Sequence, residues 1–452
     1  MNSSIRVAIK LMLLEFIQFQ LSILRPLWPY IQLTWWAWLP PLLAFGAWKM
    51  WVFYLRVWYF ANLKWVLLEV RIPKEMAKSP QAMEQIFAGL HSAFRRFDFE
   101  EKYWKGLQTD YFSFEIVSVG GKVHFYIYTP SDYINLIQAL VYSQYPESEV
   151  KEVEDYSPTL PENIPNDEWN LFGTEFALAK PDPYPIRTYK DFLVEDISLK
   201  EEARKVDPLS ALAEVLSNIK PHEVVGVHFL IRPTGDDWKK KAEELVFKLI
   251  GREIPKKSGL LEQLLPGGNM DLSWPIREVV WPGSDVLTGK NEKKSEKSPD
   301  MLMMRLSPGE QEIVKAVEKN IAKIGYETIL RFIYIGKAKE FDMMNFAAIQ
   351  GVLRQFNTLN LNSFKTQSKG MTTAKWYNPW RVRVKLRKKK KFYNYFKLRK
   401  PFLDTYILHS KPFIFNIEEL ATVYHFPGGT VGALTTQRIE AKRGEPPSDL
   451  PI

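Results

Sequence analysis

A run of 23 residues without a formal charge, residues 26–48, constrains this chain most. At about 1.5 Å per residue, a helix over the run would cross the ~30 Å hydrocarbon core of a bilayer. Trp and Tyr crowd both ends of the run, and these amphipathic rings favour the interface between lipid and water. The run therefore predicts a membrane anchor, with a buried core helix as the alternative. The residues that mark the anchor are Trp35, Trp36, Trp38, Pro40, Pro41 and Trp48, and the Pro pair is expected to kink it.

Basic residues beside the run predict its orientation. Lys49, Arg56 and Lys64 follow it closely, and Lys and Arg near a span usually stay in the cytoplasm. The preceding residues 5–24 have an apolar period of about 3.6 residues, which fits either an amphipathic surface helix or a second span. We therefore expect residues 1–62 to form an anchor in a bacterial cytoplasmic membrane, with one or two spans and a cytoplasmic body.

The composition argues against several kinds of chemistry. The chain has no Cys, which removes disulfides, thiolate metal sites and Cys nucleophiles. Its six His lack metal-binding spacing, and neither GxSxG nor GxGxxG occurs. The nearest approach to a phosphate-binding loop, residues 283–291, has one residue too many between its glycines and ends on Asn291 instead of Ser or Thr. We therefore predict no enzymatic activity, metal or cofactor, and keep a cryptic enzyme as a third hypothesis.

Residues 63–156 alternate strand and helix patterns. Gly120 and Gly121 separate two β-rich runs, which is a hairpin signal. Ser79 before Pro80 predicts a helix start with Ser79 as the N-cap. The predicted elements are a strand at 63–72, a helix from 79, strands at 111–119 and 122–128, a helix at 132–145 and a strand at 149–153. This order is typical of a ferredoxin-like α+β domain.

Residues 157–365 predict a second, decorated α+β domain. Ser307, Pro308 and Glu310 have the spacing of a helix N-terminus with a capping box. Residues 251–300 lack periodicity and are interpreted as a mobile insertion. An internal duplication is possible, but no residue-level repeat links the two domains, so we do not predict one. The fold class expected for the whole chain is α+β, with an N-terminal transmembrane anchor before the two units.

Residues 366–452 hold a basic segment and an extended tail. Residues 381–400 carry eleven Lys or Arg, interleaved with four aromatic residues, and no acid. Positive charge beside aromatic rings suits a single-stranded nucleic acid, whose phosphates pair with Lys and whose bases stack. The same combination of charge and rings suits an anionic lipid surface. The third interpretation is a solvated basic loop. The candidate binding residues are Arg387, Lys388, Lys389, Lys390, Lys391, Tyr393, Tyr395, Lys397, Arg399 and Lys400.

Three stretches carry a family resemblance. They are WVLLEVRIPKEMAKSPQAMEQIFAGLHS at 65–92, VYSQYPESEVKEVEDY at 141–156, and NIEELATVYHFPGG at 416–429 followed by AKRGEPPSDLPI at 441–452. The chain resembles the N-terminal, membrane-proximal region of conjugation-type (type IV secretion-like) DNA-transfer ATPases of candidate-phyla bacteria. In those proteins the EPP-LP segment leads into a P-loop motor, which has no counterpart here.

The resemblance implies a membrane-anchored, non-catalytic assembly or docking subunit of a conjugation or secretion-like translocation machine. It implies a separate P-loop ATPase or other machine subunits as partners, besides the lipid bilayer. DNA and further copies of the chain are possible partners too. Glu445, Pro446 and Pro447 would dock the partner. The alternative is a membrane-tethered nucleic-acid-binding protein that acts through residues 381–400.

Overall fold

The computed structural model describes residues 28–73, 78–192, 207–250, 306–367, 370–375, 377–399 and 411–427. The chain divides into two compact units. The helical unit comprises residues 1–64 and 96–108, and the sheet unit comprises residues 65–95 and 109–452.

The helical unit contains α2 (Trp28–Asn62) and the short α4 (Phe99–Tyr103). α2 runs for 35 residues and includes Pro40 and Pro41. The Trp48 ring stacks on Tyr103, with 5.9 Å between ring centroids. Trp35, Trp36 and Trp38 are exposed, as are many other apolar side chains of α2, so the helix presents apolar surface along its length.

The predicted anchor at residues 26–48 is wrong. Among the described residues, no helix combines the length and the apolar character that crossing a bilayer requires. α2 is long enough, but Gln32, its Trp residues and the Pro pair lower its mean hydropathy, and Lys49 and Arg56 lie in its second half. The predicted localisation in a membrane with one or two spans is therefore wrong as well. Residues 5–24, the possible second span, lie outside the described residues.

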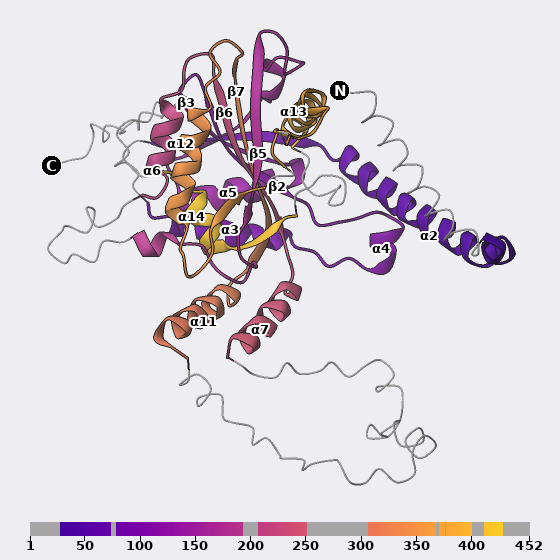
Figure 1. Ribbon diagram of the computed structural model, residues 1–452. Coiled ribbons are helices and arrows are strands. Elements are labelled where there is room, and N and C mark those ends of the chain that lie inside the picture. Colours follow the sequence, from indigo (N-terminus) through magenta and orange to yellow (C-terminus); the bar gives the residue numbers. More distant parts are fainter. Residues whose placement is uncertain are drawn as a thin grey trace, which may run out of the picture. The chain divides into compact units, whose positions relative to one another are not determined.

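The sheet unit is built on one antiparallel sheet, which has nine strands among the described residues. The strands follow the order β4-β1-β3-β2-β6-β7-β5-β8, and β9 pairs with β7 (Figure 1). Their bounds are β1 (Trp65–Arg71), β2 (Phe112–Val119), β3 (Lys122–Pro130), β4 (Glu149–Val153), β5 (Trp169–Leu178), β6 (Val224–Pro233), β7 (Gly325–Lys337), β8 (Phe364–Thr366) and β9 (Phe413–Asn416).

This sheet contains the same topology twice. The order β4-β1-β3-β2 is that of a split βαβ unit, and β8-β5-β7-β6 repeats it with the second set of strands. β2 pairs with β6 antiparallel, so the two halves join edge to edge into one sheet. The two α+β domains expected from the sequence therefore share a single sheet. The duplication was not predicted, because strand order repeats here without a repeat of residues.

Helices accompany each half. The first half has α3 (Gln81–Leu90) and α5 (Ile134–Gln144), and the second has α6 (Ser210–Ser217) and α12 (Met344–Leu353). α7 (Asp237–Ile250) and α11 (Pro308–Ile321) lie between β6 and β7 in the chain, and α13 (Arg381–Lys397) and α14 (Ile417–Val423) follow β8. Short 3-10 turns include η3 (Ser157–Thr159) and η4 (Tyr189–Phe192).

The sheet separates two cores. α3, α5, α6, α12 and α14 bury their apolar side chains against one face, together with strand residues such as Phe114 and Phe332 (Figure 1). Alternate strand residues, among them Val117 and Ile333, face the opposite core, where α13 packs. Each fully buried Leu, Ile or Phe side chain contributes about 1.5–3 kcal/mol, so both cores stabilise the sheet.

Two helix starts expected from the sequence have different outcomes. Ser307 caps α11, and its side chain forms a capping box with Glu310, as predicted. α3 instead has Pro80 as its N-cap residue, without a side-chain capping bond. The Ser79 hydroxyl accepts a long bond of 3.4 Å from the backbone N–H of Gln81. Ser79 therefore precedes the cap position, and the prediction for it was wrong by one residue.

Candidate nucleic-acid interface

The basic segment folds into α13, an amphipathic helix that packs on the sheet. Phe392, Tyr393 and Phe396 are buried in the core on that face. They follow one another at spacings of one and three residues, which places them on one side of a helix. Tyr393 also donates a hydrogen bond from its hydroxyl to the backbone carbonyl of Pro161, at 2.5 Å. The aromatic residues interpreted as base-stacking groups are therefore largely structural.

Two glycines in the strands make room for this helix. A Cβ atom on Gly173 of β5 would collide with the ring of Phe392, and one on Gly226 of β6 would lie 2.8 Å from the ring of Phe396. Real Cβ atoms do not approach neighbours so closely. Gly at both positions thus allows the aromatic side of α13 to lie directly against the backbone of the sheet.

Arg399 fastens the end of the helix to the sheet. Its guanidinium donates to Glu115 Oε1 at 2.6 Å and to Asp155 Oδ2 at 2.8 Å, and the Arg399 side chain is only 1% exposed. The guanidinium also lies 4.4 Å from the ring centroid of Tyr128, in cation–π geometry. Arg399 adopts a left-handed backbone conformation, with φ of 47°. Arg399 therefore holds two carboxylates and is not available for a phosphate.

The carboxylate of Glu115 belongs to a buried polar chain beneath α13. The Tyr156 hydroxyl lies 2.8 Å from Glu115 Oε2 and 2.8 Å from His228 Nε2. If Tyr156 donates to Glu115, Nε2 of a neutral His228 must carry the proton that Tyr156 accepts. Burial lowers the pKa of His228 to about 3, which agrees with a neutral ring. Burial alone would raise the pKa of Glu115, but the charge of Arg399 outweighs it and holds that pKa below its usual range.

The predicted binding residues divide between the two sides of α13. Arg387 and Lys390 are exposed, and Lys388, Lys391, Tyr395 and Lys397 are half-buried. Lys389, Tyr393 and Arg399 are buried, while Lys400 lies outside the described residues.

Three of the four half-buried or buried lysines donate hydrogen bonds within the protein. Lys388 donates to the backbone carbonyl of Thr373 at 3.0 Å, and Lys397 donates to that of Glu162 at 3.3 Å. Lys389 donates to Asn170 Oδ1 at 2.5 Å, and burial lowers the pKa of Lys389 to about 8. These three lysines therefore contribute to the packing of α13.

The outer side of α13 carries a ridge of exposed cations. Arg383, Arg387 and Lys390 are exposed and stand at positions i, i+4 and i+7, on one side of the helix. A four-residue step along a helix is about 6 Å, comparable to the distance between neighbouring phosphates of an extended strand. Within the described parts of the chain, no carboxylate pairs with any of the three. We call Arg383, Arg387 and Lys390 the outer ridge.

The outer ridge works against the stability of its own helix. The first turn of α13 holds no acidic residue and two arginines, Arg381 and Arg383, where the positive end of the helix dipole disfavours cations. Arg383 and Arg387 also stand as a like-charge i,i+4 pair, which costs a few tenths of a kcal/mol. An anion on this surface would relieve both penalties. Residues that lower the stability of their own helix in this way are typical of functional sites.

Exposed apolar and aromatic side chains flank the start of α13. Trp380 is 65% exposed and Val382 is 79% exposed, and Tyr377 and Leu386 are also exposed. Large exposed rings beside cations are the groups on which unpaired bases stack. Sequence reasoning placed the aromatic contribution at Tyr393 and Tyr395 and missed Trp380, because the sequence does not show which side of α13 faces the sheet.

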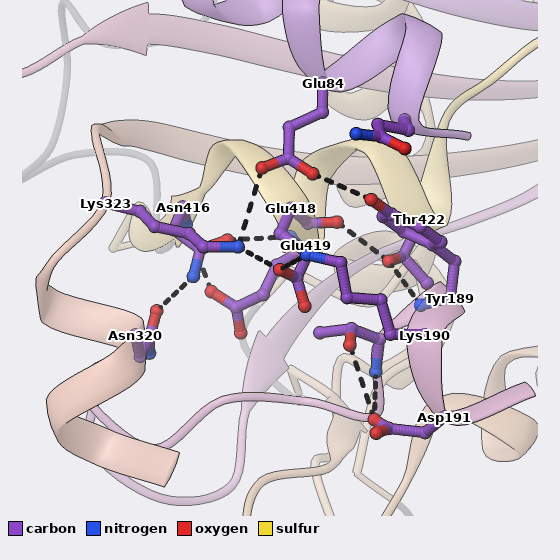
Figure 2. A network of polar contacts seen from close by, with 12 residues as sticks. Glu84, Tyr189, Lys190, Asp191, Asn320, Lys323, Asn416, Glu418, Glu419 and Thr422 are labelled. Atoms are coloured by element: carbon purple, nitrogen blue, oxygen red, sulfur yellow. Dashed lines mark hydrogen bonds and ion pairs between the residues drawn. The ribbon is translucent and has the colours of Figure 1, made fainter. Parts of the chain in front are cut away.

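A second polar network surrounds α14 (Figure 2). Lys190 donates to Glu418 at 2.7 Å, and Lys323 pairs with Glu418 and Glu84. Burial alone would raise the pKa of Glu418, but the hydrogen bonds from Lys190 and Lys323 lower it to about 2. The buried charge is therefore compensated within the network, which serves to hold α14.

The neighbouring Glu419 caps α14. Its carboxylate accepts hydrogen bonds from the backbone N–H groups of Ile186, at 2.9 Å, and of Asn416, at 3.0 Å. In return, Oδ1 of Asn416 accepts a hydrogen bond from the backbone N–H of Glu419, at 2.8 Å (Figure 2). Burial raises the pKa of Glu419 to about 8. The sequence predicted a helix from Asn416, but not that its two glutamates would be buried.

The predicted docking residues of the C-terminal tail are not among the residues that the structure describes. Glu445, Pro446 and Pro447 lie outside the described residues. Within the parts of the chain that the structure describes, no cluster of three or more His, Asp or Glu could hold a metal ion.

Comparison with known proteins identifies the family of the chain but does not indicate its function. No curated protein matches this chain. One family model matches residues 60–431, which covers most of the chain, including every strand of the sheet and α13. The chain therefore belongs to the family described as a domain of unknown function (DUF8128).

Proposed function

We propose that this protein is a non-catalytic nucleic-acid-binding protein that contacts the phosphate backbone through the outer ridge of α13. The observation that carries the proposal is the ridge itself. Its three exposed cations lie on one helical face, no carboxylate pairs with them among the described residues, and the first of them, Arg383, stands unfavourably in the first helical turn. A bound polyanion supplies the negative charge that the helix lacks.

A single strand fits this surface better than a duplex. Phosphates follow the ridge, and the exposed ring of Trp380 offers a face for an unstacked base. Among the described residues 377–399, Asn394 is the only exposed Asn or Gln, so base-edge readout has little support. Binding should therefore depend strongly on salt and weakly on sequence.

A triple substitution tests the proposal. Arg383→Gln, Arg387→Gln and Lys390→Gln together remove the ridge charges without touching the buried side of α13. The matched control neutralises three exposed lysines elsewhere in the sheet unit, at Lys122, Lys315 and Lys319. Fluorescence anisotropy with a labelled single-stranded oligonucleotide should show a loss of at least about tenfold in affinity for the ridge variant. Equal losses of affinity in both variants would show that binding depends only on net charge, and would refute a specific role for the outer ridge.

Docking to a translocation machine stays a prediction from the resemblance. The residues on which it depends, Glu445, Pro446 and Pro447, lie outside the described residues. Copurification with a P-loop ATPase would support this second role, and it would not conflict with nucleic-acid binding by α13.

A further inference from the structure

A pocket of about 340 Å³ lies in the sheet unit, and no residue of α13 lines it. One wall is the segment Pro181–Pro183, and the opposite wall is a side of α7 that includes Trp238 and Leu245. Ile414 of β9 completes the lining. The lining is therefore mostly apolar, and Asp182 brings a carboxylate into it.

The Pro181–Pro183 wall is held from behind by two buried amides. Asn320 donates to the carbonyl of Pro183 at 2.9 Å, and Asn362 donates to that of Tyr184 at 2.9 Å. Both Asn side chains are almost fully buried. Side chains that hold a loop through its carbonyls fix its shape, so the pocket is preformed.

The opposite wall is fixed by close packing. Trp238 is buried, and a Cβ atom on Gly325 would lie 2.7 Å from Trp238 Nε1. The indole can therefore lie directly against the backbone at the start of β7, because residue 325 has no side chain. Val246, on the same helix, packs with Val314 and Val317 of α11 and fixes α7 from its other side.

Asp182 lacks a strong partner for its charge. Its carboxylate accepts a backbone hydrogen bond from Ile414 and is stabilised by the nearby charge of Lys241, but no ion pair to Asp182 within 4.0 Å occurs among the described residues. Burial raises the pKa of Asp182 to about 6, so the carboxylate is charged at neutral pH at an energetic cost. A cation in the pocket would offset that cost.

We propose that this pocket binds an alkylammonium group, whose charge pairs with Asp182 and whose alkyl arm packs on Trp238 and Ile414. The ammonium can belong to a lysine side chain or to a free primary amine. The chemistry is the same in both cases: one cation, three donor hydrogens and a flexible apolar stem.

Other charged groups around the pocket modulate this ion pair. Lys241, Glu244 and Lys248 of α7 also line the pocket, and together they carry one net positive charge, which the carboxylate of Asp182 balances. Glu419 of α14 interacts electrostatically with Asp182 and adds to the negative potential when it is ionised. The side chains of Lys241 and Lys248 are exposed, so solvent screens their repulsion of a ligand.

Ligand-observed saturation-transfer NMR on the full chain tests the proposal. The probes are pentylammonium, Nα-acetyl-lysine methylamide and, as a neutral isostere, 1-pentanol. Pentylammonium should bind, and pentanol should bind at least about tenfold more weakly; the lysine probe distinguishes the two sources of the ammonium group. Asp182→Asn should weaken pentylammonium binding by about tenfold or more, whereas Glu244→Gln, the control at the other lining carboxylate, should change it less than about twofold.

The pH dependence on the unsubstituted chain gives a second, independent readout. With a pKa near 6, the ionised fraction of Asp182 rises about tenfold between pH 5 and pH 7.5, and pentylammonium affinity should rise with it. Binding by pentylammonium alone would assign a free amine, and binding by both probes a lysine side chain. Unchanged binding in Asp182→Asn, equal binding of pentanol, or a flat pH profile would each overturn the proposal.

Discussion

Substitution of Arg399 by Met tests whether this residue fastens α13 to the sheet. The side chains of Arg399 and Glu115 are 1% and 0% exposed, so the change leaves a buried carboxylate without its cation. Removing one partner of a buried ion pair typically costs about 3–5 kcal/mol, because the remaining charge stays desolvated. The lost cation–π contact with Tyr128 adds about 1 kcal/mol. We therefore expect the free energy of unfolding to fall by about 4 kcal/mol.

Urea unfolding followed by circular dichroism measures this loss. Arg387→Met, on the same helix but exposed, should change the free energy of unfolding by less than about 0.5 kcal/mol. Arg399→Met combined with Glu115→Gln removes both charges and should recover much of the loss. A cost for Arg399→Met below about 1 kcal/mol, or no recovery in the double variant, would refute the assignment of Arg399 as a buried anchor.

Three further predictions concern buried or capping positions. Burial lowers the pKa of His228 to about 3, so its contribution to stability is complete above the unfolded pKa of about 6.5 and is lost as the pH falls towards 3, at about 1.4 kcal/mol per pH unit. His228→Gln should therefore make the urea midpoint depend less steeply on pH in that range. A dependence equal to that of the unsubstituted chain would contradict this. Gly173→Ala should lower the free energy of unfolding by about 1–3 kcal/mol, because the new methyl group collides with Phe392, and adding Phe392→Leu should restore part of the loss. No loss of stability in Gly173→Ala would mean that α13 does not lie against β5. Ser307→Ala should cost about 1 kcal/mol in the same assay, against no measurable change for Ser79→Ala.

Local signals predicted local structure. The Gly120–Gly121 pair predicted the hairpin of β2 and β3, and both glycines have positive φ, at 57° and 84°. Ser307 with Glu310 predicted the start of α11 because a capping box involves residues only three apart. Each prediction depended on contacts within a few residues of the chain.

Long-range contacts explain what the sequence did not reveal. Gly173 and Gly226 matter because of Phe392 and Phe396, which lie far away in the chain. Without these contacts the whole basic segment was interpreted as surface, although Lys389, Phe392, Tyr393, Phe396 and Arg399 are buried. The anchor prediction failed for another reason. Residues 26–48 carry no charge, but their Trp and Pro residues keep the mean hydropathy below what a membrane span needs.

The salt dependence of single-strand binding tests the central claim most directly. Each phosphate contact contributes about 0.7 to the slope of log K against log salt for a single strand, so loss of the three outer-ridge cations should reduce the slope by about 2. The unsubstituted chain and the Lys122, Lys315 and Lys319 control should retain the same, steeper slope. A slope unchanged by the triple substitution at Arg383, Arg387 and Lys390 would show that α13 does not contact the phosphates.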